Sequence, residues 1–536
     1  MTFPIRWMRF AGVALLSLLL NAYGYGRQGG RESQAVIPVA DTSVTHRIVA
    51  RVGPINITAG EFLLAYDFGP AFVKREKDSK RKFLGYMIDE KLLALDAAER
   101  GERTNPSVVR SVNEIVHDLA TEELYRDDVL SKVHLSEDEL QDGVAAQRVH
   151  YALQWIYSPT REGIEQYRRA LDTLVPFDTL FRASLGDSVT PDLRSWETTR
   201  FKVRTTRPEI AAVADTLKVG KFSAPVEGPD GWYLLYLKNM AFDAVTTTSE
   251  AEQQLHDARE VLTQQKADSL SDLYVDRLMR SHAPVIQRET LDLLSCILAQ
   301  TWLPGNLRSS LLSTLSVDHE IALAAASDPG RFGNKPLVKM NDRVVAMKRF
   351  LEWYDARSTI LRLRATSVHA FQLSLEQLVW RMVRDGLLVD RAFQRKLQNR
   401  ESVRTQRAWW EDKVLFAMEK RKFESSIPMS DAALKAYYSA HRRRYTGEHG
   451  DTLAFAAARN DVTRDYVSQE MTKLLFHRLV ALRRKYPVRI EEQILASLPV
   501  DSENDRRAID VYVAKKGGTF PHPAFPTIDY DWQTWE

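Results

Sequence analysis

Residues 50–66, ARVGPINITAGEFLLAY, carry the pattern on which the fold prediction rests: a short apolar strand, a turn and the beginning of a helix. Residues 338–354, VKMNDRVVAMKRFLEWY, repeat this order. A second pair of matches follows, LLALDA at 92–97 and LLVDRA at 387–392, in predicted amphipathic helices, the first of which should end at Gly101. Because the matches keep their order along the chain, we predict an internal repeat.

A third pair of matches and two closing helices extend the repeat. Ser136 and Ser430 are each predicted to cap the N-terminus of a helix. Each copy then ends in a long amphipathic helix followed by a Pro-Val pair, at 258–282 in the first copy and at 458–486 in the second. The chain between the capped helix and the closing helix is much longer in the first copy. We therefore predict a separate small domain inserted at 147–240.

The inserted domain has its own pattern of strands and helices. An apolar strand is predicted at 151–157, a helix at 162–174 and an aromatic-rich strand at 231–237. The predicted fold class is α+β and mostly helical, with a helical module in tandem whose first copy is interrupted by a small α/β domain. The predicted parts are a signal peptide at 1–26, module 1 at 44–146, the inserted domain at 147–240, the closing helix of module 1 at 241–290, a helical connector at 291–337, module 2 without an insert at 338–500 and a Pro- and aromatic-rich tail at 501–536.

The composition argues against several classes of protein. The chain has 74 basic and 71 acidic residues, so it lacks the basic excess of a dedicated nucleic-acid binder, and no nucleic-acid partner is expected. The lone cysteine, Cys296, cannot form an internal disulfide or a Cys-based zinc site. The histidines are scattered, and phosphate-binding and zinc-protease motifs are missing from the sequence. We expect no metal site and no cofactor.

The N-terminus has the pattern of an export signal. Arg6 and Arg9 precede an apolar run at 10–20, which is too short to span a bilayer and is followed by small residues. We predict that residues 1–26 are removed as a signal peptide. The apolar residues 291–303 are interrupted by polar ones and are predicted to form a buried helix. The expected mature protein is soluble, periplasmic or otherwise exported, and has no integral membrane span.

The order of these elements, with IDEKLL at 88–93 in the first long helix, resembles the SurA/PrsA group of bacterial periplasmic and surface chaperones. In that family the N- and C-terminal helices form one chaperone domain, and the insertion is a parvulin-type peptidyl-prolyl isomerase. The inserted domain here contains three stretches similar to parvulin motifs: FDTL at 177–180, DLRSW at 192–196 and LKVGKFSAPV at 217–226. The resemblance implies that the insertion at 147–240 is parvulin-like.

The positions that catalyse isomerisation in the family are changed in this chain. Active parvulins place two histidines and a hydrogen-bonded Cys or Asp around the prolyl peptide. The first histidine position falls near Trp155 and the second on Tyr233, while Asp187 is a candidate for the Cys/Asp position. The resemblance therefore assigns no catalytic residue, and whether the scaffold is an active enzyme stays open.

The proline-binding positions are partly retained. The resemblance implies that Leu193 lines the proline pocket, and it places the family's methionine and phenylalanine at about Thr206 and Ile210. His150 precedes the predicted strand and is expected at the surface rather than as a displaced catalytic histidine.

The resemblance implies a chaperone that binds unfolded or nascent exported polypeptides in the cell envelope, with outer-membrane proteins among the candidate clients. Two alternatives stay open: an active isomerase with a rearranged pocket, and a non-catalytic subunit of an envelope complex. A holdase needs exposed apolar surface, but aromatic residues at helical spacing are expected in the core. The second copy holds several of them: Trp380, Trp409, Trp410, Phe416, Phe423, Tyr437, Tyr438 and Phe455.

Two further features lie near the C-terminus. The basic clusters at 442–444 and 483–485 are expected to be solvated helix ends, where cations oppose the negative pole of the helix dipole. The stretch 517–536 contains aromatic residues among prolines and is too Pro-rich for a helix. It is expected either to dock onto its own protein or to act as a tethered imitation of an aromatic-rich client.

Overall fold

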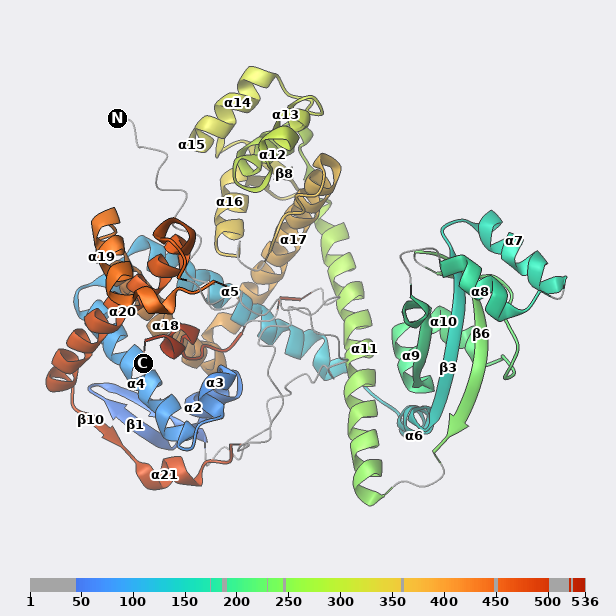
Figure 1. Ribbon diagram of the computed structural model, residues 1–536, viewed down its shortest axis with the longest axis horizontal. Coiled ribbons are helices and arrows are strands. Elements are labelled where there is room, and N and C mark those ends of the chain that lie inside the picture. Colours follow the sequence, from blue (N-terminus) through green and yellow to red (C-terminus); the bar gives the residue numbers. More distant parts are fainter. Residues whose placement is uncertain are drawn as a thin grey trace. The chain divides into compact units, whose positions relative to one another are not determined.

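The computed structural model describes residues 45–173, 175–185, 190–228, 230–243, 247–357, 361–447, 452–500, 520–521 and 524–535. The predicted signal peptide lies outside them. The chain divides into two compact units (Figure 1). Of the described residues, 128–272 form one, which we call the sheet unit, and 45–127 with 273–535 form the other, which we call the helical unit. The fold class is α+β and mostly helical, as predicted.

The sheet unit is built on an antiparallel sheet with the strand order β4-β3-β6-β5. Its strands are β3 (Val149–Ser158), β4 (Ser195–Thr199), β5 (Val226–Gly228) and β6 (Gly231–Phe242). The strands predicted at 151–157 and 231–237 are confirmed as β3 and β6, and both are longer than expected. They form the central pair, which explains their apolar and aromatic composition.

Helices cover both faces of this sheet. Since neighbouring residues of a strand point to opposite faces, β3 and β6 each supply apolar side chains to both. α7 (Arg161–Asp172) and α8 (Phe177–Leu185) pack against the face that carries Ile156 and Leu234. α9 (Arg200–Thr206) and α10 (Pro208–Ala214) pack against the face that carries Leu153 and Leu235. The helix predicted at 162–174 corresponds to α7.

The two helices that flank this domain in the sequence also meet in space. α6 (Glu137–Gln147) begins with a capping box between Ser136 and Glu139, as predicted, and α11 (Thr248–His282) follows β6. Gly143 allows a close approach, because a Cβ atom there would lie 3.3 Å from Cβ of Ala258. The side-chain amide of Gln147 donates to the backbone oxygen of Gln254 at 2.8 Å.

The helical unit contains the two repeated entry motifs. β1 (Ile48–Val52) and β2 (Ile55–Thr58) form a hairpin, and Thr58 then caps α2 (Ala59–Asp67) by accepting from the backbone N–H of Glu61 at 3.2 Å. β8 (Pro336–Lys339), β9 (Val344–Ala346) and α16 (Met347–Asp355) repeat this order. Each of the two segments is therefore a hairpin followed by a helix.

The closing strands of the two copies are exchanged. β10 (Val488–Ile490), at the end of the second copy, pairs with β1 of the first. β7 (Val285–Ile286), at the end of the first copy, pairs with β8 of the second. The registers are equivalent, with Ile490 opposite Ala50 and Ile286 opposite Val338. The two sheets thus have the orders β10-β1-β2 and β7-β8-β9, and each combines a hairpin with a strand from a distant part of the chain.

The remaining helices of this unit fill the space around the two sheets. Gly101, with a φ of +82°, ends the first long helix, α4, as predicted, and the predicted buried helix at 291–303 is α12. The helices are α3 (Ala71–Lys74), α4 (Ser79–Glu99), α5 (Pro106–Asp128), α12 (Arg288–Trp302), α13 (Gly305–Leu312), α14 (His319–Ser327), α15 (Pro329–Phe332), α17 (Val368–Gln394), α18 (Glu401–Ser426), α19 (Asp431–His441), α20 (Phe455–Lys485) and α21 (Glu492–Ser497).

The aromatic residues of the second copy are mostly core residues, as expected. Phe416 and Tyr437 are buried, and the other phenylalanine and tyrosine residues of the set pack partly buried against the same core. The tryptophans are half-buried. Of the basic clusters, the first forms the short 3-10 helix η7 (Arg442–Arg444) after α19, while Arg483 and Lys485 at the end of α20 pair with Asp89 and Glu99. Within the described ranges, every helix is too short or too polar to cross a membrane.

Candidate functional site

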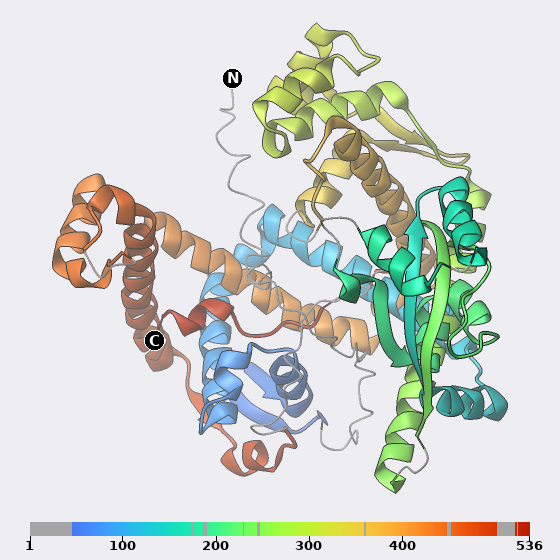
Figure 2. The same ribbon diagram turned by 45° about the vertical axis from the view of Figure 1, so that its right-hand side comes forward.

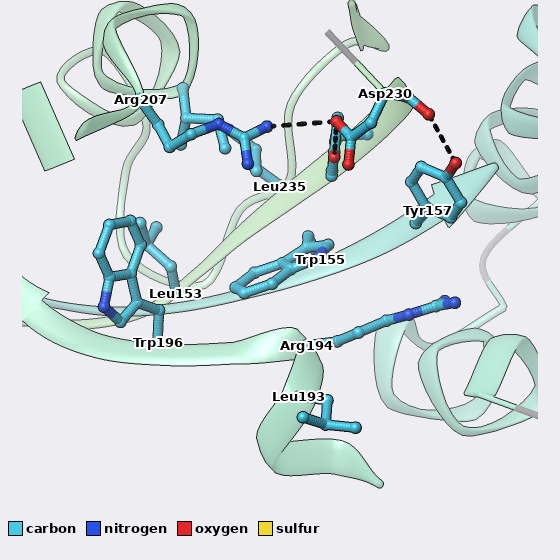
Figure 3. A pocket seen from close by; sticks show the side chains of 11 residues that line it. Leu153, Trp155, Tyr157, Leu193, Arg194, Trp196, Arg207, Asp230 and Leu235 are labelled. Carbon is cyan, nitrogen blue, oxygen red and sulfur yellow. Dashed lines mark hydrogen bonds and ion pairs between the residues drawn. The ribbon is translucent and has the colours of Figure 1, made fainter. Parts of the chain in front are cut away.

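A pocket of about 380 Å³ opens in the sheet unit, on the face that carries α9 and α10 (Figure 3). It lies between the strands β3 and β6, the short helix η5 (Pro191–Arg194) with the strand β4 that follows it, and the beginning of α10. Its lining residues are Leu153, Trp155, Tyr157, Leu193, Arg194, Trp196, Arg207, Ile210, Asp230, Tyr233 and Leu235.

The floor and walls of the pocket are apolar. Leu153 and Leu235 are buried beneath it, and Ile210 closes one side. Trp155, two residues beyond Leu153 on β3, points to the same face. Leu193 lies at the rim and is 56% exposed. Such an opening can remove an apolar side chain of a ligand from water, which is worth about 1.5–3 kcal/mol for a residue of leucine size.

The hairpin between β5 and β6 fits closely against two tyrosine rings. A Cβ atom at Gly228 would lie 2.7 Å from Cε2 of Tyr233. Gly231 has a φ of +148°, and a Cβ atom there would lie 2.7 Å from both the backbone oxygen of Ser158 and Cε2 of Tyr157. Glycine at both positions therefore allows Tyr157 and Tyr233 to pack against the turn at one end of the pocket.

Polar groups meet at this end of the pocket. The hydroxyl of Tyr157 donates to the backbone oxygen of Asp230 at 2.6 Å, and the hydroxyl of Tyr233 donates to the Asp230 carboxylate (Figure 3). Nη2 of Arg207 lies 3.7 Å from Oδ1 of Asp230, and its guanidinium lies 5.2 Å from the ring centroid of Tyr233. Nε of Arg207 donates to Glu209 at 2.5 Å.

Tyr233 is therefore a neutral hydrogen-bond donor. Burial and the hydrogen bond to Asp230 raise the pKa of Tyr233 above its ordinary value, so its hydroxyl keeps its proton near neutral pH. That proton is directed to Asp230. The side chain of Tyr233 thus contributes a ring to the pocket wall, and its hydroxyl is engaged within the protein.

Arg194 fixes the opposite rim of the pocket. Its Nη1 donates to the backbone oxygen of Ser184 at 3.1 Å, and its guanidinium lies 5.6 Å from the ring centroid of Tyr157. The hydroxyl of Ser195 donates to the backbone oxygen of Pro191 at 2.9 Å, which closes the turn of η5. These contacts hold Leu193 at the mouth of the pocket.

Four of the positions assigned from the family resemblance come together here. Trp155, Tyr233, Leu193 and Ile210 all line the pocket. Thr206 does not line it: it is the last residue of α9, and its hydroxyl donates to the backbone oxygen of Lys202 at 2.6 Å. The next residue, Arg207, lines the pocket instead.

Two other predicted residues have different outcomes. His150 is at the surface as predicted, but it is the second residue of β3 rather than a residue before the strand. Its Nε2 lies 2.8 Å from Oδ2 of Asp243. Asp187, the candidate for the Cys/Asp position, lies outside the described residues.

Four residues that line the pocket were not predicted from the sequence: Arg194, Trp196, Arg207 and Asp230. Trp196 and Arg194 belong to the quoted DLRSW stretch, so that motif held the signal for both. Arg207 could have been found from Pro208, because proline favours the first turn of a helix and places the preceding residue outside it. In the described part of the chain, no group of three or more His, Cys, Asp or Glu residues is arranged to hold a metal ion.

The sequence matches no family model and no curated protein. Solved structures of PrsA are similar to parts of the chain. A peptidylprolyl isomerase (PrsA) from Bacillus cereus has 14% identity and a TM-score of 0.22, and the match covers 42% of this chain and 91% of that one. PrsA from Bacillus anthracis has 13% identity and a TM-score of 0.21, with 36% and 96% covered. PrsA from Bacillus subtilis has 14% identity and a TM-score of 0.16, with 42% and 92% covered. TM-scores this low carry no weight for fold or activity.

Proposed function

We propose that this protein is a chaperone that binds unfolded polypeptides through the pocket of the sheet unit and does not catalyse prolyl isomerisation. The observation that carries the proposal is the lining of the pocket. Trp155 and Tyr233 occupy the positions that the family resemblance assigns to catalytic histidines, and both contribute aromatic surface. The pocket therefore keeps the means to bind an apolar side chain while its polar groups differ from those of the active family.

An unfolded client offers two kinds of contact to this surface. Its apolar side chains can enter the pocket, where Trp155 and Trp196 provide large aromatic walls. Its backbone can pair with β4, which is an edge strand of the described sheet and carries Trp196. Backbone pairing accepts many sequences and suits a protein that binds unfolded chains in general.

Catalysis would need more than binding. Isomerisation crosses a barrier of about 18–20 kcal/mol, because the amide must lose its conjugation as it twists. Groups that stabilise the twisted amide have to be free to bond to it. The hydroxyls of Tyr157 and Tyr233 both donate to Asp230, so neither is available to a substrate in this arrangement.

One observation favours an active isomerase as a second candidate. Nη2 of Arg207 is buried at the pocket wall, and its contact with the Asp230 carboxylate, at 3.7 Å, is longer than a hydrogen bond. As a prolyl amide twists, its nitrogen regains a lone pair that a guanidinium N–H at the pocket wall could bond. The second candidate predicts that the protein accelerates isomerisation of a proline-containing tetrapeptide and that Arg207→Ala removes the acceleration.

The binding proposal is tested by the affinity for a permanently unfolded client, such as a reduced and carboxymethylated protein. Leu193→Ala removes an exposed side chain from the mouth of the pocket and is expected to weaken binding about three- to ten-fold. Leu130→Ala is the matched control, because Leu130 is 40% exposed in the same unit and does not line the pocket. Equal affinities of the two variants and the wild type would contradict a role for the pocket.

The cellular location is part of the same proposal. We propose that the protein is exported through the predicted signal peptide at 1–26 and meets unfolded or nascent exported polypeptides in the cell envelope. N-terminal sequencing of the protein purified from an envelope fraction is expected to show that this segment has been removed. A protein that keeps its first residues and stays in the cytoplasmic fraction would contradict export.

A further inference from the structure

The end of the chain occupies a second binding surface, in the helical unit. Residues 524–529 are extended, and the one-turn helix η8 (Tyr530–Gln533) follows (Figure 2). We call residues 524–535 the C-terminal segment. The residues that hold it lie on α2, α3, α4, α18 and α20 or just beyond α2, and we call their surface the C-terminal groove: Ala65, Phe68, Phe72, Tyr86, Glu90, Trp410, Phe416, Lys420 and Ser468.

The segment is bound as a peptide ligand is bound. Among the described residues, its backbone–backbone hydrogen bonds all lie within the segment itself. Side chains of the groove contact its backbone instead: Nε1 of Trp410 donates to the oxygen of Ala524 at 3.2 Å, and the hydroxyl of Ser468 donates to the oxygen of Thr534 at 2.8 Å. The segment belongs to none of the described sheets. A separate peptide could therefore make the same contacts with the groove.

Aromatic side chains anchor the segment. Trp532 is 5% exposed and stacks on Tyr86, with ring centroids 5.2 Å apart. Phe525 packs on Phe68, with ring centroids 5.1 Å apart. Ile528, Tyr530 and Trp535 also contact the groove, so apolar side chains are distributed along the whole segment. Aromatic anchors in pockets dominate the affinity of peptide recognition.

The groove also contains a cation, the side chain of Lys420, that pairs with the segment. Nζ of Lys420 lies 3.1 Å from Oδ2 of Asp529 and pairs with Asp531 as well, and it lies 4.9 Å from the ring centroid of Trp535. Burial favours the neutral amine, but the two carboxylates hold the pKa of Lys420 above its ordinary value. Both ion pairs of Lys420 within the described ranges are with the segment.

A buried acceptor completes the site. Oε1 of Glu90 accepts from the backbone N–H of Asp529 at 2.6 Å and from Nε1 of Trp532 at 3.0 Å. The charge of Glu90 is balanced by Lys413 of the groove wall, at 2.7 Å, and not by the segment. A cavity of about 30 Å³ remains beside residues 526–528, which is room for about two water molecules.

We propose that the C-terminal groove is a second polypeptide-binding site, which the chain fills with its own C-terminal segment and which accepts other extended segments of the same chemistry. The ligand class is a peptide with an acidic residue between aromatic ones, as in Asp529, Tyr530, Asp531 and Trp532. Lys420 binds the acidic side chain of Asp529. Glu90 accepts hydrogen bonds from a backbone N–H and from the indole of Trp532. Tyr86 and Phe416 stack on the indole ring. The inference does not depend on the pocket of the sheet unit.

The test separates the segment from the groove after folding. A specific protease site is placed between Val500 and Phe520, the folded full chain is cut, and a fluorescent peptide of residues 517–536 is added. The peptide is expected to replace the cut segment and to bind in a saturable way by fluorescence anisotropy, while circular dichroism shows an unchanged fold. Peptides with Asp529→Ala or Trp532→Ala are expected to bind about ten-fold or more weakly, since each loses a charged or aromatic contact.

Gln533→Ala is the matched control peptide, because Gln533 is exposed within the same helical turn, and it is expected to bind as the unaltered peptide does. Lys420→Ala in the groove should weaken the unaltered peptide and leave little further effect for Asp529→Ala. A cut segment that never exchanges with added peptide, or a helical unit that unfolds when the segment leaves, would overturn the proposal. Equal binding of the Asp529→Ala peptide would overturn the proposed ligand class.

Discussion

The pocket of the sheet unit and the C-terminal groove of the helical unit differ in how the chain builds them. All residues of the pocket lie between Leu153 and Leu235, and about 380 Å³ stays open to a ligand. The groove combines side chains from α2 to α20 with a segment at the end of the chain, and only about 30 Å³ is left beside that segment. A site within one continuous stretch can be recognised from local motifs, whereas a site assembled from distant stretches has no local pattern.

The two regions also differ in how they treat charge. Beside the groove, the helical unit buries Glu90 and Lys413 as a pair, and Lys91 lies between Glu61 at 2.6 Å and Asp412 at 2.7 Å. The pocket keeps its charged side chains at the rim, where Asp230 is 61% exposed. Charge therefore contributes more to the surroundings of the groove than to the pocket, and the two sites should respond differently to the same kind of substitution.

The largest expected effect comes from cutting the chain between Gly333 and Asn334, which separates β1 from β10 and β7 from β8. Because β1 needs β10 and β8 needs β7, neither fragment should form the helical unit alone. The sheet unit, whose strands all lie in the first fragment, should still fold there. Circular dichroism melting of each fragment and of the co-expressed pair measures this. A cooperative helical unit in either fragment alone would contradict the exchanged pairing.

A smaller but still large effect is expected at the buried pair below the groove. Lys413→Met leaves Glu90 buried without its cation, so the free energy of unfolding of the helical unit should fall by about 3–5 kcal/mol in urea titrations. Adding Glu90→Gln should recover most of the loss. The matched control is Lys435→Met, since Lys435 pairs with Asp431 at an exposed site and should matter by less than about 1 kcal/mol. If Lys413→Met lowered the stability of the sheet unit and left that of the helical unit unchanged, the proposed role of the buried pair would be wrong.

In the sheet unit, the expected sensitivity lies in the backbone of the hairpin. Gly231→Ala introduces a Cβ atom 2.7 Å from the backbone oxygen of Ser158 at a φ of +148°, so it should destabilise the sheet unit by about 2–4 kcal/mol. Gly386→Ala in α17 meets open space and should instead stabilise its helix by about 0.5–1 kcal/mol. Thermal melting of both variants compares the two effects, and equal melting would show that the hairpin is not tightly packed.

The smallest expected effect is a pH dependence next to the groove. Burial raises the pKa of Asp89 to about 6 in spite of its pairing with Arg483, from 3.8 for an exposed carboxyl. The folded state then binds this proton more tightly than the unfolded state, so stability falls as pH rises from about 4 to about 6. The contribution is about 1–3 kcal/mol. Asp89→Asn should remove this slope in urea titrations over that range, and parallel curves for the variant and the wild type would contradict it.

Local structure was predictable where neighbours in sequence decide it. The caps at Ser136 and Gly101, the strands around Trp155 and Tyr233 and the buried helix at 291–303 all follow from spacing and turn residues. The exchange of β7 and β10 was not predictable in the same way. Each closing strand meets an entry strand in an equivalent register, so the same apolar pattern is compatible with either pairing.

Part of the pocket in the sheet unit was also predictable, because local motifs determine where several of its residues lie. Motif spacing placed Trp155, Leu193, Ile210 and Tyr233 in one pocket, because sheet and turn geometry fix their positions. It placed Thr206 there in error, since the break between α9 and α10 turns Arg207 toward the pocket instead. The C-terminal groove could not be predicted from the sequence, because contacts such as that between Glu90 and Trp532 join residues that are far apart in the chain.

The most direct test of the central claim measures two activities on one preparation of the full chain: suppression of aggregation of an unfolding client, and the rate of prolyl isomerisation in a tetrapeptide. Binding through an aromatic pocket without catalysis predicts that aggregation falls as the protein approaches the concentration of the client, while isomerisation proceeds at its uncatalysed rate. Isomerisation well above that rate, abolished by Arg207→Ala, would contradict the account and establish the pocket as an enzyme's active site.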